Sequence, residues 1–263
     1  MAGRTTLRVN RLAEIERLLS SGEGVTVDDL TGRLGVSQAT VRRDLDSLQA
    51  SGLVHRTHGG AVAVGPRLRE RPFPERSTVN VAEKQAIASE AAHLVSAGDT
   101  VFIGGGSTTL RLAQQLADLE LTVVTNSLSV AHQLANAPGA QVIVIGGTLR
   151  APELTMIGPR AVDAILSYRA QLAFLGVPAL DCEHGFTADG DAEAATDAAF
   201  MSMARRTVVL ADHTKLGRVS TTHVAPLSAI DTVVTDDGAS PTQLAQLRSA
   251  GPLVSVARVV RDG

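Results

Sequence analysis

Residues 36–45 read Val-Ser-Gln-Ala-Thr-Val-Arg-Arg-Asp-Leu, and this stretch decides how the front of the chain folds. Ser37 is a good N-cap, because its hydroxyl can accept a hydrogen bond from a backbone N–H in the first turn of a helix. Val41, Leu45 and Leu48 follow at the spacing that puts apolar side chains on one helical face. The stretch therefore predicts a helix whose outward side chains are polar or basic, namely Gln38, Thr40, Arg42 and Arg43.

Two further helices are predicted in front of this one. Thr26 is a second good N-cap, and Asp29, three residues later, completes a capping box. Gly35 ends that helix, and apolar residues at helical spacing predict another helix within residues 10–19. Three short helices, with a glycine-containing turn before the basic one, are typical of a helix-turn-helix. In that motif the second helix enters the major groove of DNA.

Residues 53–62 form two short β-prone runs around polar residues and a pair of glycines, a pattern that predicts a hairpin, or wing. Arg and Gln side chains can read base edges, whereas hydroxyls, backbone amides and the Arg56 guanidinium can hold phosphates. The alternatives are a solvated helix face and, for His55 and His58, a metal pair. Because no cysteine or paired carboxylate lies near these histidines, we expect no metal. The residues expected to bind DNA are Ser37, Gln38, Ala39, Thr40, Arg42, Arg43, Arg56 and His58.

The rest of the chain is predicted to be a separate α/β domain. Residues 65–78 contain three prolines and no periodicity, which predicts a linker between a DNA-binding domain at 1–64 and a second domain at 79–263. A helix within residues 81–95 is followed by β-branched runs that alternate with helical stretches, an order that indicates a largely parallel sheet covered on both faces. The expected strands are 100–103, 121–124, 141–145, 172–175, 207–211, 232–235 and 253–256.

Ligands of such sheets bind beside the carboxyl ends of the strands, so the loops there indicate function. The first strand leads into residues 104–109, Gly-Gly-Gly-Ser-Thr-Thr, and then into a helix. Glycines free backbone amides and a helix N-terminus favours an anion, so the loop suits a phosphate, although close packing of a tight turn would also explain its glycines. It is neither a Walker loop nor a dinucleotide fingerprint, and no nucleotide cofactor is expected.

Three more loops carry polar groups at the same edge. They follow the second, third and fifth strands, and the last contains Lys215, one of only two lysines in the chain. A point charge there fits a phosphate or sugar oxygen, while an ordinary surface lysine is the alternative. The expected effector-binding residues are Gly105, Gly106, Ser107, Thr108, Thr109, Asn126, Ser127, Gly146, Gly147, Asp212 and Lys215.

Composition narrows the class of protein. Residues 1–76 carry 12 Lys+Arg against 9 Asp+Glu, while the remaining residues carry 12 against 18, so the basic excess lies with the expected DNA-binding domain. A single cysteine excludes an internal disulfide, and the 2% aromatic content disfavours base stacking on single strands. Because no signal peptide or membrane span is evident, we expect a cytoplasmic protein.

The motifs resemble those of a known family. Residues 36–45, followed by Gly52-Leu53 and by Arg56-Thr57-His58-Gly59-Gly60-Ala61, resemble the signature of the DeoR family of bacterial regulators. The resemblance extends to the family's sensor domain, which is similar to ribose-5-phosphate isomerase and binds sugar phosphates. Its motifs here are residues 106–109, 124–127, 145–147, 184–187 and 211–215.

This resemblance implies a winged helix-turn-helix joined to a ribose-5-phosphate-isomerase-like α/β sensor and oligomerisation domain. The implied protein is a non-enzymatic regulator, by family precedent a repressor of a carbohydrate operon. Its partners would be double-stranded operator DNA, a phosphorylated sugar and further copies of the chain, in a homodimer or larger assembly. Two positions depart from the family pattern, because Gly104 replaces a frequent Asp and Asp197 a frequent Lys.

Two other functions are compatible with the residues. A sugar-phosphate isomerase would need a general base near the substrate, for which Asp212, Asp191 and Glu193 are candidates. A constitutive DNA-binding protein would use its second domain only to dimerise. A sensor that binds without turnover explains best why a ligand-binding type of domain is joined to a DNA-binding one.

Overall fold

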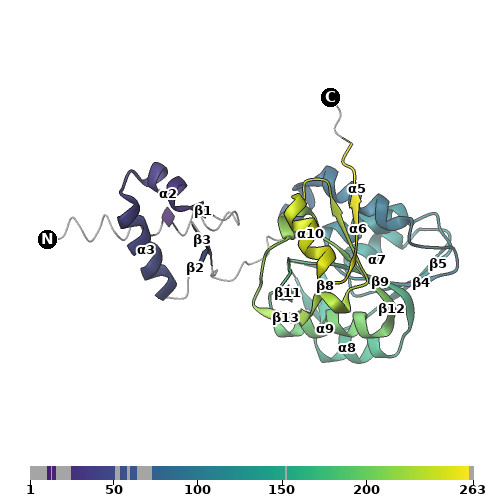
Figure 1. Cartoon of the computed structure of the whole chain (residues 1–263). Coiled ribbons are helices and arrows are strands. Elements are labelled where there is room, and N and C mark those ends of the chain that lie inside the picture. Colours follow the sequence, from purple (N-terminus) through teal and green to yellow (C-terminus); the bar gives the residue numbers. More distant parts are fainter. Residues whose placement is uncertain are drawn as a thin grey trace. The chain divides into compact units, whose positions relative to one another are not determined.

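The computed structural model of this protein describes residues 11–12, 14–15, 25–50, 54–57, 60–63, 73–151 and 153–260. The chain forms two compact units, Met1–Leu68 and Arg69–Gly263 (Figure 1). Each unit has its own hydrophobic core. None of the helices in these described ranges combines the length and the apolar character that crossing a bilayer requires.

The described residues of the first unit form two helices of at least two turns and a hairpin. Its elements are β1 (Val25–Thr26), α2 (Val27–Leu34), α3 (Gln38–Ala50), β2 (Val54–Thr57) and β3 (Gly60–Ala63). Strands β2 and β3 pair antiparallel, and β1 adds to β3. The two helices and the hairpin agree with those predicted from the sequence. Residues 11–12 and 14–15 are helical and lie within the first predicted helix.

Local signals in the sequence position these helices. The Thr26 hydroxyl accepts a hydrogen bond from the Asp29 backbone N–H at 3.1 Å, and the Asp29 carboxylate accepts one from the Thr26 backbone N–H at 3.4 Å, so the predicted capping box is formed. Gly35 ends α2 in the left-handed conformation at φ 63°. One apolar cluster then holds the helices together, made of Ile15, Val27, Leu30, Val41, Leu45 and Leu48.

A seven-stranded sheet with every neighbouring pair parallel forms the centre of the second unit (Figure 1). Its order is β15-β14-β12-β9-β4-β5-β6. All seven strands lie where they were predicted, with ends that differ by up to three residues. Their bounds are β4 (Thr100–Ile103), β5 (Leu121–Thr125), β6 (Ala140–Val144), β9 (Ala170–Gly176), β12 (Ala204–Leu210), β14 (Thr232–Asp236) and β15 (Leu253–Ala257).

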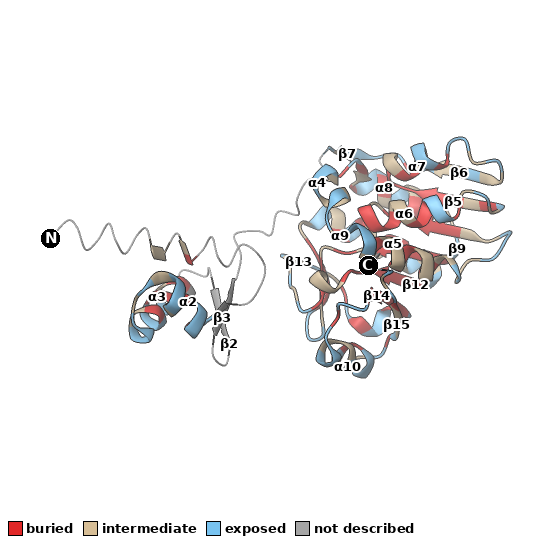
Figure 2. Cartoon of the chain, turned by 90° about the horizontal axis from the view of Figure 1, so that it is seen from above, coloured by how far each residue is buried: buried red, intermediate tan, exposed pale blue. Residues whose placement is uncertain are grey.

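Helices cover both faces of this sheet, as parallel strands require. On one face α5 (Val81–Ala92), α6 (Ser107–Gln115) and α7 (Leu128–Leu134) share an apolar cluster with the strands. On the other, α8 (Pro159–Leu166), α9 (Asp191–Met203) and α10 (Pro241–Ser249) share a second cluster. Figure 2 shows the result, with buried strands between helices whose outer faces are exposed.

Several small elements were not predicted. Strands β7 (Thr148–Arg150) and β8 (Thr155–Ile157) form an antiparallel hairpin, and β10 (Ala179–Asp181), β11 (Gly185–Ala188) and β13 (Thr222–Ala225) form a separate sheet. Two single-turn 3-10 helices, η1 (His213–Lys215) and η2 (Leu227–Ala229), complete the unit. The strands of these hairpins are only three or four residues long, and β13 pairs with a segment more than 30 residues away, so periodicity did not reveal them.

Part of the predicted linker is helical instead. Residues 73–78 form α4 (Phe73–Thr78), although their prolines and polar residues show no helical period. Tertiary contacts hold this turn, because the Lys84 Nζ donates hydrogen bonds to the backbone carbonyls of Arg76 at 2.6 Å and Val79 at 2.7 Å. Arg111 donates another to the Ser77 carbonyl at 3.2 Å.

Candidate functional site

Helix α3 presents the predicted polar face to solvent. Val41 and Leu45 are fully buried, and this fixes the rotation of the helix so that Gln38, Arg42 and Arg43 are exposed. Neither arginine contacts a carboxylate among the described residues, so both guanidinium groups remain available to a polyanion. The exposed first turn also holds Ser37 and Ala39, while Thr40 is half-buried.

Polar contacts fix α3 against the rest of the first unit. The buried carboxylate of Asp44 accepts hydrogen bonds from Arg11 Nε at 2.5 Å and from Arg11 Nη2 at 3.2 Å. On the other side the Gln38 amide donates to Asp28 of α2 at 2.7 Å. A helix held at these points presents its outward arginines in a defined register.

The wing is present as a backbone hairpin. Arg56 lies on β2 and pairs in register with Ala61 of β3. The side chain of Arg56 and the whole of His58 lie outside the described residues, so their predicted DNA contacts stay predictions.

In the second unit the glycine loop joins β4 to α6 as expected. Gly106 has φ 152°, a conformation that favours glycine, and α6 begins after it without a side-chain cap or an acidic residue in its first turn. Helix α7, by contrast, is capped by Ser127. The first backbone N–H groups of α6 have no partner within the helix, which makes this end suitable for an anion. Ser107, Thr108 and Thr109 are buried there.

The first glycines of the loop serve close packing. A Cβ at Gly105 would lie 2.0 Å from Thr155 Cγ2 of β8, so the β7–β8 hairpin can approach only a glycine. A side chain at Gly104 would press on Leu175, since its Cβ alone would lie 3.0 Å from that residue. Close packing therefore explains the glycines at positions 104 and 105. The part of the loop that suits an anion is the N-terminal end of α6.

Three other predicted residues hold the same hairpin or the helix beside it. The Asn126 amide donates to the Met156 carbonyl at 3.0 Å, while its own Oδ1 is buried without a hydrogen-bond partner among the described residues. The Ser127 hydroxyl accepts from Val130 N–H at 3.3 Å and caps α7. Gly147 packs closely against Ile157 of β8. Asn126 Oδ1 and, on α6, Arg111 Nε are thus buried atoms whose hydrogen-bonding capacity the described residues leave unused.

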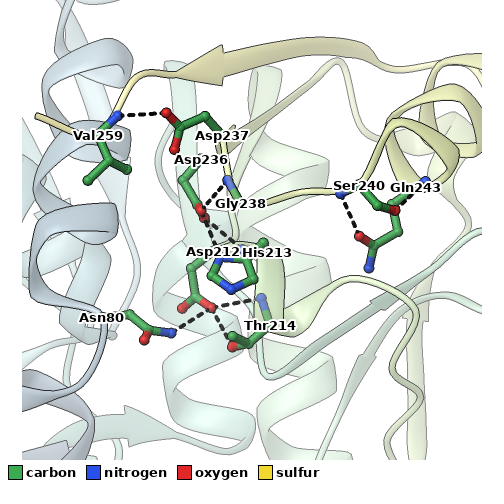
Figure 3. Close-up of polar contacts among 10 residues, drawn as sticks. All are labelled: Asn80, Asp212, His213, Thr214, Asp236, Asp237, Gly238, Ser240, Gln243 and Val259. Atoms are coloured by element: carbon green, nitrogen blue, oxygen red, sulfur yellow. Dashed lines mark hydrogen bonds and ion pairs between the residues drawn. The ribbon is translucent and has the colours of Figure 1, made fainter. Parts of the chain in front are cut away.

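Asp212 organises the turn after β12. Its Oδ1 accepts hydrogen bonds from Asn80 at 3.3 Å, from the Thr214 backbone N–H at 3.1 Å and from the Thr214 hydroxyl (Figure 3). The residue is only 2% exposed, so its carboxylate contributes to the site by fixing the positions of Asn80 and Thr214. The turn that it stabilises is η1, which carries the predicted Lys215.

Lys84 adds a buried cation that the sequence reasoning missed. Burial lowers its pKa to about 8, the nearby Asp212 carboxylate opposes this, and Lys215, Arg76 and Arg111 lower the pKa further. Three basic side chains therefore act electrostatically on Lys84, and the carboxylate of Asp212 opposes them. Arg111 lies on α6, one turn after Ser107. An anion at this end of α6 would relieve their mutual repulsion.

The carboxylates that an isomerase would need are engaged elsewhere. Glu193 of α9 pairs with Arg150 at 2.5 Å, and Arg150 also lies 3.0 Å from Glu153. Asp191 accepts a hydrogen bond from the Thr222 hydroxyl at 3.1 Å.

Comparisons with known proteins agree with this architecture. The family model of the DeoR C-terminal sensor domain matches residues 79–237, and that of the DeoR-like helix-turn-helix domain matches residues 11–67. The chain belongs to the DeoR family. This DeoR-family chain is therefore a helix-turn-helix transcription regulator with a sensor domain, as the sequence predicted.

Its relatives span nearly its whole length. The HTH-type transcriptional regulator YulB of Bacillus subtilis is 32% identical over 97% of this chain and 98% of that protein. The regulator GlpR of Haloferax volcanii is 36% identical over 94% and 97%, and a putative aga operon transcriptional repressor of Escherichia coli O157:H7 is 32% identical over 90% and 89%. These names describe regulators, in agreement with the prediction that the DeoR-family chain is not an enzyme.

A solved structure is also similar. The ribose 5-phosphate isomerase A of Methanocaldococcus jannaschii matches at a TM-score of 0.38 and 19% identity, covering 51% of this DeoR-family chain and 53% of that chain.

Proposed function

We propose that this regulator represses a carbohydrate operon in the cytoplasm, and that a phosphorylated sugar bound by the second unit changes its affinity for operator DNA. The observation that carries the proposal is the arrangement at the end of α6. The uncapped helix end lies one turn before Arg111, and Arg111, Arg76 and Lys215 each lower the pKa of Lys84. This arrangement suits a phosphate, and Asn126 Oδ1 suits a neighbouring donor such as a sugar hydroxyl.

For the DNA, we propose that α3 lies in the major groove. Gln38, Arg42 and Arg43 would contact base edges or phosphates, and the wing would contact the backbone through Arg56 and His58. Two or more copies would bind repeated half-sites. A single helix-turn-helix makes few base contacts, so pairing them raises both affinity and specificity.

The effector can act only through a difference in affinity. A sugar phosphate that bound the DNA-competent and DNA-incompetent states equally would shift neither population. We therefore expect the sugar phosphate to bind one arrangement of the assembly more tightly, and the repressor names among the relatives favour release from DNA as the result.

The test needs operator DNA, which in vitro selection from a random duplex library with the purified chain provides. Fluorescence anisotropy then measures DNA affinity with and without ribose 5-phosphate, fructose 1-phosphate and glycerol 3-phosphate. We expect at least one of them to weaken binding, and Lys215→Ala to keep DNA binding while losing that response. DNA affinity that is unchanged by every sugar phosphate tested would contradict the sensor function.

The DNA-binding surface has its own prediction. Arg43→Ala or Arg42→Ala should weaken operator binding by about 1–3 kcal/mol if the side chain reads a base, or lower the salt dependence if it holds a phosphate. Arg206→Ala, at an exposed arginine of β12, is the matched control and should change neither quantity. Unchanged affinity and salt slope in both α3 variants would show that another surface binds DNA.

A further inference from the structure

A histidine–aspartate pair lies where β12 and β14 end, and the function proposed above does not use it. His213 follows β12 and Asp236 ends β14, two strands that are neighbours in the sheet. The His213 Nδ1 lies 2.7 Å from Asp236 Oδ2 (Figure 3). Because a carboxylate accepts hydrogen bonds, the proton of this bond belongs to Nδ1, and the second ring nitrogen is Nε2.

The surroundings of Asp236 are built to hold the imidazole. The carboxylate is 0% exposed and accepts two backbone hydrogen bonds besides that of the ring, from His213 N–H at 2.7 Å and from Gly238 N–H at 3.0 Å. A Cβ at Gly238 would lie 2.6 Å from His213 Nδ1 and 2.7 Å from Asp236 Oδ2, so only glycine leaves room for the pair. A buried carboxylate with three donors fixes the direction of the ring.

The ring itself remains accessible. The side chain of His213 is 32% exposed, and no hydrogen bond to Nε2 is formed by any of the described residues. In Figure 3 the imidazole lies between Asp236 and the Asp212–Thr214 turn. Residue 213 also shares η1 with Lys215, which belongs to the proposed effector site. An oriented, partly exposed imidazole on the same turn as Lys215 is therefore in a position to meet a ligand of that site.

Sheet order places the turn that carries His213 on the same edge of the sheet as the glycine loop. Only β9 separates β12 from β4, the strand that leads into the glycine loop. Neighbouring strands lie about 4.8 Å apart, so the ends of β4 and β12 are about 10 Å apart along the sheet edge. A sugar phosphate with its phosphate at the end of α6 could extend across this interval.

We propose that His213, oriented by Asp236, hydrogen-bonds a hydroxyl group of the sugar part of the effector and so selects among sugar phosphates. The inference rests on the proposed sensor function. A hydroxyl matches this position because it donates to a neutral Nε2 and accepts from a protonated one, whereas a phosphate oxygen only accepts. The phosphate binds at α6 and Lys215, and the sugar binds at His213.

Isothermal titration calorimetry on the full chain tests this division, with inorganic phosphate, glycerol 3-phosphate, ribose 5-phosphate and fructose 1-phosphate as probes. His213→Asn keeps a nitrogen donor close to the position of Nδ1 and removes Nε2. We expect it to weaken binding of the preferred sugar phosphate about five- to tenfold, the effect of one hydrogen bond, and to leave inorganic phosphate unchanged.

A second variant perturbs the His213–Asp236 pair without changing either of its side chains. Gly238→Ala removes no functional group but displaces the imidazole, so it should give the same selective loss. Gly190→Ala is the matched control, because a Cβ at Gly190 meets no atom within 4 Å, and it should bind every probe as the wild type does.

The outcomes separate the two hypotheses. If His213→Asn binds the sugar phosphate as tightly as the wild type, or loses inorganic phosphate to the same extent, the inference about His213 is wrong and the sensor function stands. If the wild-type chain binds none of the four probes, both the sensor function and the role of His213 are overturned.

Discussion

Among single residues, Lys84 connects folding and function most directly. Its ammonium group is buried where the chain enters the sensor unit, and its two hydrogen bonds hold the carbonyls around the end of α4. Burial disfavours the charged form of a lysine, and this is why its pKa falls to about 8. The same cation is available to attract an anion to the neighbouring helix end. One residue thus orders the entry to the domain and adds positive charge to the proposed site.

This lowered pKa predicts how stability depends on pH. Between about pH 8 and 10.5 the lysine of the unfolded chain keeps its proton, while Lys84 of the folded chain has lost it. The unfolded state then binds more protons, so the contribution of Lys84 to the free energy of unfolding rises with pH across this range and is constant below it. Relative to Lys84→Met, the wild type should therefore gain stability from pH 8 to pH 10.

Urea denaturation of both proteins at pH 7, 8, 9 and 10 measures this difference. Titrating groups that do not interact with Lys84 cancel in the comparison, because the two chains share them. If the difference in free energy of unfolding between wild type and Lys84→Met stays constant or falls above pH 8, a charged lysine is not buried at this position.

At the scale of elements, the β7–β8 hairpin and the glycine loop depend on each other. The hairpin crosses the loop so closely that Thr155 occupies the space where a side chain at position 105 would be. Gly105→Ala should therefore destabilise the protein by about 1–3 kcal/mol through overpacking. Thr155→Ser removes the clashing methyl group, and the nearest remaining atom, Thr155 Cβ, would lie 3.5 Å from the new Cβ.

The double variant Gly105→Ala, Thr155→Ser should therefore recover most of the stability that Gly105→Ala loses. Thermal unfolding of the wild type, the two single variants and the double variant gives the coupling between the positions. Additive effects would mean that the loop and the hairpin adjust independently.

Elements that rest on local signals were predictable from the sequence. The β-branched runs gave the strands, and Thr26 with Asp29 gave the start of α2, because a capping box needs only residues three apart. Helix α4 and the hairpin were missed because residues distant in sequence hold them, Arg111 for α4 and Gly105 and Asn126 for the hairpin.

The same distinction applies to the candidate site. The glycine loop and Lys215 follow predicted strands, so their common edge could be inferred from a parallel sheet. Lys84 and the His213–Asp236 pair come together only when α5, β12 and β14 pack, and no spacing along the chain predicts that. A signal for Lys84 was present, since the chain has only two lysines and the other one had been assigned to the site.

At the scale of the whole molecule, α4 is the first described element of the sensor unit. The chain therefore enters the sensor unit through α4. Its carbonyls are held by Lys84 and Arg111, two of the four cations of the proposed phosphate site. An anion that draws these cations toward itself would change how firmly α4 is held. A looser α4 should therefore weaken the response to effector more than effector binding itself.

Glu75 and Thr78 allow this to be tested, because both are exposed residues of α4. We compare Glu75→Gly, Thr78→Gly with Glu75→Ala, Thr78→Ala, because both double variants remove the same side-chain contacts. Each glycine should make the helical state of α4 less favourable by about 1 kcal/mol relative to alanine. We expect the Gly variant to bind sugar phosphate normally and to show a smaller change in DNA affinity. Equal responses in the two variants would exclude α4 as a connecting element.

Coupling between two sites is reciprocal, and this gives the last prediction. If a sugar phosphate lowers operator affinity by some factor, operator DNA must lower sugar-phosphate affinity by the same factor, typically 5- to 150-fold. Calorimetric titration with and without operator measures the second factor, and anisotropy measures the first. Scrambled DNA and Lys215→Ala are the controls. Loss of DNA binding that persists in Lys215→Ala would show that the phosphate competes at the arginines of α3, because direct competition needs no sensor site at all.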